Sequence, residues 1–368
     1  MKGKANRTRK RESGRRITIL DVARHAGVSH MTVSRVINGD SNVRDKTRSA
    51  VAASIKALRY SPNTAARNLA NSQGFLIGLC YANPTDTYLA EILLGCFTQA
   101  NLSRCQLVLE PRRETETELS ALKRLLEKGV DGIILTPPLC SSKSALKAIS
   151  AEGIPAALVT SGRPMAGFSA VSINDRKASR EMTQHLLALG HRRIGFIAGD
   201  PSHSASEERL RGFKDAMTAA GLPVRANQVA RGLFTYQSGL EATERLLGSG
   251  LKPTAIFASN EEMALAAITV AGRMGLDVPG DISIAGFDDT PVATMMTPAL
   301  TVVRRPIAEM AREAVRILAE QLSASRAGLS LPTPHRILDF TIVKRASTDR
   351  APGAKRLSAT AAECRDLG

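Results

Sequence analysis

The hydrophobic pattern changes once along the chain, near residue 75. From there on, short apolar runs rich in β-branched residues alternate with longer stretches whose apolar residues recur at helical spacing. The runs include FLIGLCY, QLVLE, DGIILT, PAALV, RIGFIA, TAIFAS and DISIAGF. Strands that alternate with helices are typical of βαβ units, and about ten strands over about 270 residues exceed one compact domain. The pattern therefore predicts an α/β region of two lobes, each a doubly wound parallel sheet, over residues 75–345.

The region before residue 75 has a short, wholly helical pattern. Asp21 begins a predicted helix, Gly27 supplies a tight turn that suits a residue without Cβ, and Ser29 can cap a second helix. The faces predicted to be buried contain Val22, Ala23 and Ala26 in the first helix and Val33, Val36 and Ile37 in the second. Two short helices joined by a glycine turn predict a helix-turn-helix unit over residues 17–62.

The outer face of the second helix has side chains that suit DNA. Arg35 can donate two hydrogen bonds to a guanine edge in the major groove. His30 and Met31 lie at the N-terminal end of the helix, which is the end that reaches the bases in such units. Phosphate contacts are expected from Thr32, Ser34 and Asn38. The alternative is an ordinary helical hairpin whose polar face is solvated.

The charge distribution separates the two regions further. The chain has 368 residues and a net charge of +16, and residues 1–75 carry 16 lysine and arginine side chains against 4 acidic ones. Residues 1–16 are polar and basic without periodic apolar positions, which predicts a disordered arm. A positive segment joined to a nearly neutral body indicates a nucleic-acid-binding module. A solvated basic tail is the alternative interpretation.

Other classes of protein find no support in the sequence. The five cysteines form no C-x-x-C pair, so neither a disulfide framework nor a thiolate zinc site is expected, and a reducing cytoplasm fits. Neither a signal peptide nor an apolar stretch of about 18 residues occurs, so no membrane span is expected. The phosphate-binding glycine motifs and the G-x-S-x-G elbow are absent. We therefore expect no catalytic activity, no cofactor and no metal site.

Specific motifs connect these features to a known family. DVARHAGVSHMTVSRVIN (21–38), VRDKTR (43–48), YSPN (60–63) and ARNLA (66–70) occur in the N-terminal region. The body contains DGIIL, GHRRIGFIAG, RLRGF, ASNEEMA, GFDDT and TPALT in the same order as the family. The chain resembles the lactose/galactose-repressor (LacI/GalR) family over about residues 17–345.

The resemblance implies how the N-terminal region binds DNA. Residues 63–74 would form a hinge helix and linker, and so short a helix is marginal until it docks on DNA. Leu69 would insert into the minor groove and kink the operator, although an apolar contact within the linker is the alternative. A homodimer or higher oligomer is expected on a pseudo-palindromic double-stranded operator. The predicted DNA contacts are Thr18, Ser29, His30, Met31, Thr32, Ser34, Arg35, Asn38, Asn63, Ala66 and Leu69.

The resemblance also implies a periplasmic-binding-protein-like body with an effector cleft between its lobes. Ligands of open sheets lie beyond the carboxyl ends of the strands. Asp288 could instead cap a helix, and Arg209 could instead pair with a neighbouring surface glutamate. Thr160 departs from the family, whose members often carry Asp there. The predicted effector contacts are Tyr88, Arg209, Phe234, Asn260 and Asp288.

These features together predict a sequence-specific transcriptional repressor that a small sugar releases from its operator. A regulator that needs its effector as a corepressor, or that activates transcription, remains an alternative. A cytosolic sugar-binding protein without specific DNA binding is a more remote one. Residues 346–368, rich in Arg, Ala, Ser and Pro, are expected to form a flexible tail.

Overall fold

The computed structural model describes residues 19–37, 43–58, 74–82, 86–113, 115–160 and 165–352. By its internal contacts the chain divides into two units, Met1–Gly74 and Phe75–Gly368. No helix within the described ranges is long and apolar enough to cross a membrane. The predicted basic arm (1–16) and hinge helix lie outside the described residues, apart from Gly74 at the end of the linker.

The first unit contains three short helices around a small apolar core. They are α1 (Ile19–Ala26), α2 (His30–Ile37) and α3 (Asp45–Ala57). The core consists of Val22, Ala23, Val33 and Val51. The predicted helix-turn-helix is thus confirmed, with α1 beginning two residues before Asp21.

Local chemistry sets the turn between α1 and α2. Gly27 has a φ of +65°, which is in the left-handed region that disfavours residues with a Cβ. The Ser29 hydroxyl accepts a hydrogen bond from the Thr32 amide at 3.1 Å, so it caps α2 as predicted. His25 Nδ1 and Ser54 Oγ lie 3.0 Å apart and connect α1 to α3.

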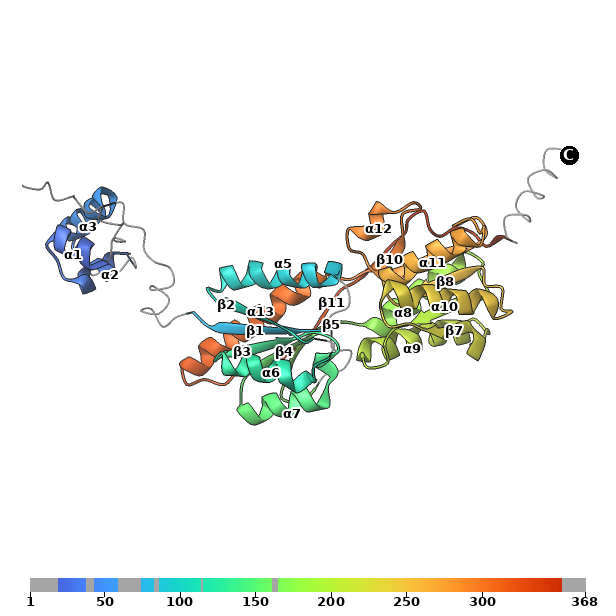
Figure 1. Cartoon of the computed structure of the whole chain (residues 1–368), viewed down its shortest axis with the longest axis horizontal. Helices are drawn as coiled ribbons and strands as arrows, with labels where there is room; N and C mark the ends of the chain where they lie inside the picture. The colour runs from blue at the N-terminus through green and yellow to red at the C-terminus, as the bar shows by residue number, and fades with distance from the viewer. Residues whose placement is uncertain are drawn as a thin grey trace, which may run out of the picture. The chain divides into compact units, whose positions relative to one another are not determined.

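The N-terminal lobe of the second unit is a six-stranded parallel sheet covered by helices on both faces (Figure 1). Its strand order is β11-β5-β4-β3-β1-β2. Its elements are β1 (Leu76–Tyr81), α5 (Asp86–Leu102), β2 (Gln106–Pro111), α6 (Glu118–Glu127), β3 (Gly132–Leu135), η1 (Leu139–Ser141), α7 (Lys143–Glu152), β4 (Ala156–Val159), β5 (Ser169–Ile173), α13 (Ile307–Arg326) and β11 (His335–Leu338).

The C-terminal lobe is a second six-stranded sheet with the order β12-β10-β9-β8-β6-β7. Its strands are parallel except for the edge strand β12, which pairs with β10 in the antiparallel direction. Its elements are α8 (Asp175–Ala188), β6 (Ile194–Ala198), α9 (Ser204–Ala219), η2 (Ala226–Gln228), β7 (Val229–Arg231), α10 (Tyr236–Gly248), β8 (Ala255–Ala258), α11 (Glu261–Arg273), β9 (Ser283–Asp288), α12 (Val292–Met295), β10 (Thr301–Arg304) and β12 (Thr341–Val343).

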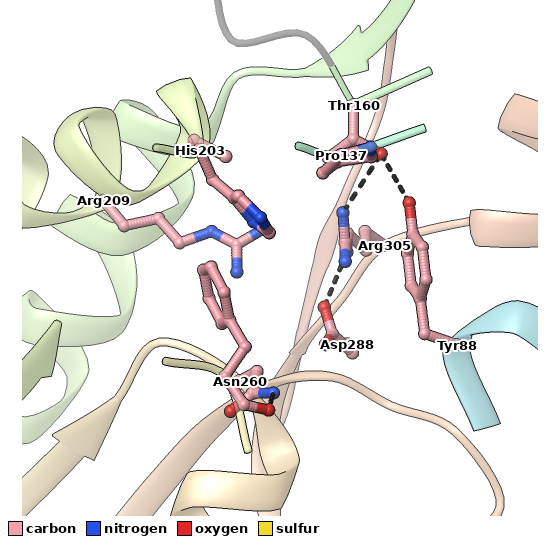
Figure 2. Close-up of a pocket in the computed structure, with 10 residues that line it drawn as sticks. Tyr88, Pro137, Thr160, His203, Arg209, Asn260, Asp288 and Arg305 are labelled. Atoms are coloured by element: carbon pink, nitrogen blue, oxygen red, sulfur yellow. Dashed lines mark hydrogen bonds and ion pairs between the residues drawn. The ribbon is translucent and has the colours of Figure 1, made fainter. Parts of the chain in front are cut away.

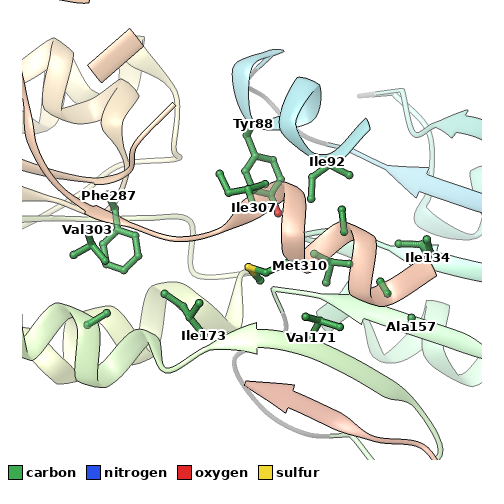
Figure 3. Packing of buried hydrophobic residues seen from close by; sticks show 14 of the residues in the cluster. Tyr88, Ile92, Ile134, Ala157, Val171, Ile173, Phe287, Val303, Ile307 and Met310 are labelled. Carbon is green, nitrogen blue, oxygen red and sulfur yellow. The ribbon is translucent and has the colours of Figure 1, made fainter. Parts of the chain in front are cut away.

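Alternating side chains of the strands supply the cores on the two faces of each sheet. Ile77 and Leu79 of β1 belong to the cluster that includes α5 and α13, whereas Cys80 belongs to the cluster with α6 and α7. Figure 3 shows Ile307 and Met310 of α13 among residues of α5 and of the strands beneath it. Both faces of the strands are therefore buried, which explains their nearly continuous apolar runs.

The chain crosses between the two lobes three times. It passes from β5 to α8, returns from β10 to α13, and passes again from β11 to β12. The segment between β10 and α13 contains only Arg305 and Pro306. Residues at these crossings can therefore contact both lobes.

The predicted flexible tail is wrong for residues 346–352. Ser347 is fully buried, its amide donates to the Ala299 carbonyl at 3.0 Å, and its carbonyl accepts from the Ile284 amide at 2.8 Å. The Ala351 amide donates to the Leu189 carbonyl at 2.9 Å. Residues 346–352 thus pack on the C-terminal lobe, where their buried backbone groups have hydrogen-bond partners. Residues 353–368 lie outside the described part.

Candidate functional site

The outer face of α2 presents the polar side chains that the sequence predicts to face DNA. His30, Met31 and Arg35 are exposed, and Thr32 and Ser34 are partly exposed. Val33 on the opposite face is fully buried, so packing on α1 and α3 fixes which face points outward. Five other predicted DNA contacts lie outside the described residues: Thr18, Asn38, Asn63, Ala66 and Leu69.

All five predicted effector contacts line one pocket between the two lobes (Figure 2). They are joined there by residues that were not predicted as contacts. The full lining is Tyr88, Pro137, Thr160, His203, Ala205, Arg209, Phe234, Asn260, Asp288 and Arg305. The cavity that these side chains enclose has a volume of about 40 Å³, which is room for water.

Arg209 lies at the floor of the pocket on the C-terminal lobe. Its Nε donates to Asp175 Oδ1 at 2.8 Å, and its Nη1 donates to the Ser259 carbonyl. The guanidinium carbon lies 3.7 Å from the centroid of the Phe287 ring. The alternative of a surface pair with a neighbouring glutamate is wrong, because the Arg209 side chain is only 2% exposed.

Asp288 is the last residue of β9 and binds Arg305, which was not among the predicted contacts. Arg305 Nε donates to Asp288 Oδ1 at 2.6 Å, and its Nη1 makes a long contact of 3.5 Å with Thr160 Oγ1. Asp288 thus forms a buried ion pair, and no hydrogen bond within the described residues makes it a helix cap. Burial by itself would lower the pKa of Arg305, but the Asp288 carboxylate raises it.

Tyr88 completes a connection from Arg305 to the N-terminal lobe. Its hydroxyl and the Thr160 hydroxyl lie 2.9 Å apart, and its ring centroid is 5.0 Å from the Arg305 guanidinium carbon. Burial raises the pKa of the Tyr88 phenol, so the group is protonated at neutral pH. Arg305 therefore contacts Asp288 in one lobe and Tyr88 and Thr160 in the other.

Phe234 and His203 form an aromatic wall on the C-terminal lobe. Their ring centroids are 4.9 Å apart and the rings are inclined by 24°. Asn260 Nδ2 donates to the Phe234 carbonyl at 2.8 Å, and a Cβ on Gly199 would overlap the Phe234 ring. Burial lowers the pKa of His203 to about 4, so this imidazole is neutral at pH 7. His203 lines the pocket but was not among the predicted effector contacts.

Three lining residues have backbone conformations that are rare for residues with a side chain. The φ angles are +64° at Thr160, +63° at Phe234 and +103° at Asp288. Such conformations cost free energy and persist where the surrounding structure imposes them, often at ligand sites. The pocket is therefore shaped by backbone as well as by side chains.

Comparisons with known proteins identify both units. Residues 18–63 match the bacterial regulatory proteins of the lacI family, and residues 183–348 match the periplasmic binding protein-like domain. Catabolite control protein A of Priestia megaterium is 36% identical over 326 residues, which cover 87% of this chain and 97% of that protein.

Two solved structures resemble the chain over most of its length. A transcriptional regulator CelR–cellobiose complex has a TM-score of 0.69 and 32% identity, covering 90% of this chain and 100% of that one. The lac repressor dimer bound to operator and the anti-inducer ONPF has a TM-score of 0.77 and 30% identity, covering 91% and 100%. The two-unit architecture and its likeness to DNA-binding regulators are thus established from both sequence and structure.

Proposed function

Because the chain belongs to the LacI family of bacterial regulatory proteins, we propose that it is a repressor that a small sugar releases from its operator. Members of this family are transcriptional regulators rather than enzymes. The observation that carries the effector part is the convergence of Tyr88, Arg209, Phe234, Asn260 and Asp288 on one pocket between the lobes. The CelR–cellobiose complex supports a sugar as the effector class.

The α2 helix is the element that we assign to base recognition. Arg35 is exposed on its outer face and donates to a guanine edge in the major groove. His30 and Met31 contact bases near the start of the helix, while Ser29, Thr32 and Ser34 bind phosphates. The lac repressor binds its operator as a dimer, which supports a homodimer on a pseudo-palindromic site here.

In the pocket, polar and aromatic groups contact different parts of the sugar. Arg209, Asn260 and Asp288 hydrogen-bond hydroxyl groups, and Tyr88 and Phe234 contact the apolar face of the ring. The enclosed cavity is only about 40 Å³, so we expect a sugar to move the lining groups when it binds. Arg305 transmits this shift because it lies on a crossing between the lobes.

Selection of bound fragments from a pool of random duplex DNA tests the DNA-binding part. The expected result is a pseudo-palindromic sequence with two equivalent half-sites, bound by two copies of the chain. The selected sequence should bind far more tightly than a scrambled duplex at the same salt concentration. Recovery of unrelated sequences, with equal affinity for the scrambled duplex, would overturn the proposal.

A further inference from the structure

Two guanidinium groups face the effector pocket from different elements. Figure 2 shows Arg209 of α9 and Arg305 of the β10–α13 crossing pointing toward each other across the pocket. Their side chains are only 2% and 6% exposed, and each has one carboxylate partner, Asp175 for Arg209 and Asp288 for Arg305. Buried cations are costly unless paired, so these ion pairs explain how both arginines are tolerated before a ligand binds.

The surface that a ligand would touch nevertheless contains more cationic than anionic groups. Asp175 lies behind Arg209 and does not line the pocket, whereas both arginines do. Asp288 is the sole acidic residue of the described lining. His203 adds no charge at neutral pH because burial lowers its pKa to about 4. The two arginines and their partners Asp175 and Asp288 therefore balance in charge, but the pocket surface itself presents two guanidinium groups and one carboxylate.

Hydrogen-bond donors also exceed free acceptors in this lining. The described residues offer acceptors to Nε and Nη1 of each arginine but none to either Nη2. The side-chain oxygen of Asn260 is already used, since it accepts from the Met263 amide at 3.0 Å. On the N-terminal lobe, Tyr88 and Thr160 contribute hydroxyls and no carboxylate. A ligand that brings acceptors and a negative charge would satisfy this surface.

We propose that the effector is an acidic monosaccharide whose carboxylate is bound by the guanidinium group of Arg305, with Arg209 facing it. The planar fork of arginine matches a carboxylate, and charge-assisted hydrogen bonds are about twice as strong as neutral ones. Both arginines already have a carboxylate partner, so the one negative charge of a carboxylate leaves less excess charge in this buried site than the nearly two charges of a phosphate. This inference rests on the proposed function because it names the chemistry of the effector.

Calorimetry on the full chain tests this inference with sugars matched in ring and stereochemistry. D-glucuronate is compared with D-glucose, and D-galacturonate with D-galactose, at one ionic strength and pH 7. The tighter-binding acid should have a dissociation constant about tenfold or more below that of its neutral partner. Glucose 6-phosphate is the third arm, and it should bind more weakly than that acid.

Three substitutions test which positive charge produces the preference for the acidic sugar. Arg305→Gln should abolish the preference for the acid, and Arg305→Lys should retain part of it, since the charge remains without the fork. Arg304→Gln is the matched control, because this neighbouring side chain is 54% exposed, pairs with Asp289 and does not line the pocket. It should bind the acid as tightly as the parent chain. Thermal unfolding of each variant confirms that it is folded.

Several results would overturn the assignment. These are neutral sugars that bind as tightly as the acids, no binding of either acid, stronger binding of the phosphate, or an unchanged preference in Arg305→Gln. The comparison of acid with neutral sugar uses the parent chain, so it decides the matter even if a variant does not fold. Sequence-specific DNA binding together with a neutral effector would leave the proposed function intact and reject only the acidic class.

Discussion

Three arginines differ in exposure and ion pairing, and these differences suit them to different ligands. Arg35 is exposed on the outer face of α2, where we propose that it contacts a base edge. Arg209 and Arg305 are buried and ion-paired, so their guanidinium groups are held in fixed orientations toward the pocket. Exposure suits recognition of a large polyanion, whereas burial in a low-dielectric pocket suits recognition of a small polar ligand.

At the residue scale, Arg35→Ala should weaken binding to the selected operator by about 1–3 kcal/mol and relax preference at one base position of each half-site. Fluorescence anisotropy with a set of single-base operator variants measures both effects. Arg24→Ala is the control for loss of a positive charge, since Arg24 is exposed on α1 and pairs with Asp21. A uniform loss of affinity over all operator variants would show that Arg35 binds only phosphate.

Glu261 predicts a pH dependence at the same scale. It is buried beside the pocket, accepts from the Thr290 amide at 2.9 Å, and has its pKa raised from 4.5 to about 7 by burial and by the nearby Asp288. The folded chain therefore binds this proton more tightly than the unfolded chain. The contribution of Glu261 to stability is fully present below about pH 4.5 and is lost as the pH rises to about 7.

Glu261→Gln removes this titration, and comparison with the parent chain cancels the opposite effects of the buried histidines. The parent chain should lose about 2–3 kcal/mol of unfolding free energy relative to the variant between pH 5 and pH 8. Urea unfolding at several pH values measures the difference. Glu244→Gln, at an exposed position of α10, should show no such trend. A constant difference between parent and Glu261→Gln would refute the assignment.

At the scale of elements, α5 and α13 approach each other closely at Gly95. A Cβ at this position would overlap the backbone carbonyl oxygen of Ala308, which no change of rotamer can relieve. Gly95→Ala should therefore destabilise the second unit by about 1–3 kcal/mol in urea unfolding. Gly248→Ala in α10 is the matched control, because a Cβ there meets nothing within 4 Å. It should be neutral or slightly stabilising, since alanine favours helix. Equal effects would contradict the close approach.

The sequence predicted helices and strands correctly where a local pattern determines them. The apolar runs gave the buried parallel strands, and Gly27 and Ser29 marked the turn into α2. The tail was mispredicted because Ser347 is polar, and its burial depends on long-range backbone partners that composition does not reveal. The antiparallel direction of β12 likewise depends on a crossing between lobes rather than on local pattern.

The candidate site was predictable where residues lie at or just after the ends of strands. Asp288 ends β9 and Asn260 follows β8, and the structure places both in the pocket, although their roles stay predictions. Arg305 was missed because nothing in the local sequence distinguishes it from its neighbour Arg304, and only the fold buries Arg305 while it leaves Arg304 exposed. The Arg304-Arg305-Pro306 sequence at a strand end was the available sign.

At the scale of the whole molecule, function depends on coupling between the pocket and the DNA-binding unit. A ligand changes operator affinity only if it binds the DNA-competent and DNA-free conformations differently. The pocket lies at the crossings between the lobes, so we propose that its occupancy selects among conformations of the second unit. By linkage, operator DNA must change sugar affinity by the same factor.

The affinity of the selected operator, titrated with and without a saturating concentration of the tightest-binding sugar at fixed salt, tests this coupling most directly. We expect an operator affinity about 5–150-fold lower with sugar, the same factor in the sugar's affinity for the operator complex, and no effect of the sugar on Arg209→Ala. An operator affinity unchanged by a sugar that calorimetry shows to be bound would refute this coupling, and an increase would establish a corepressor instead.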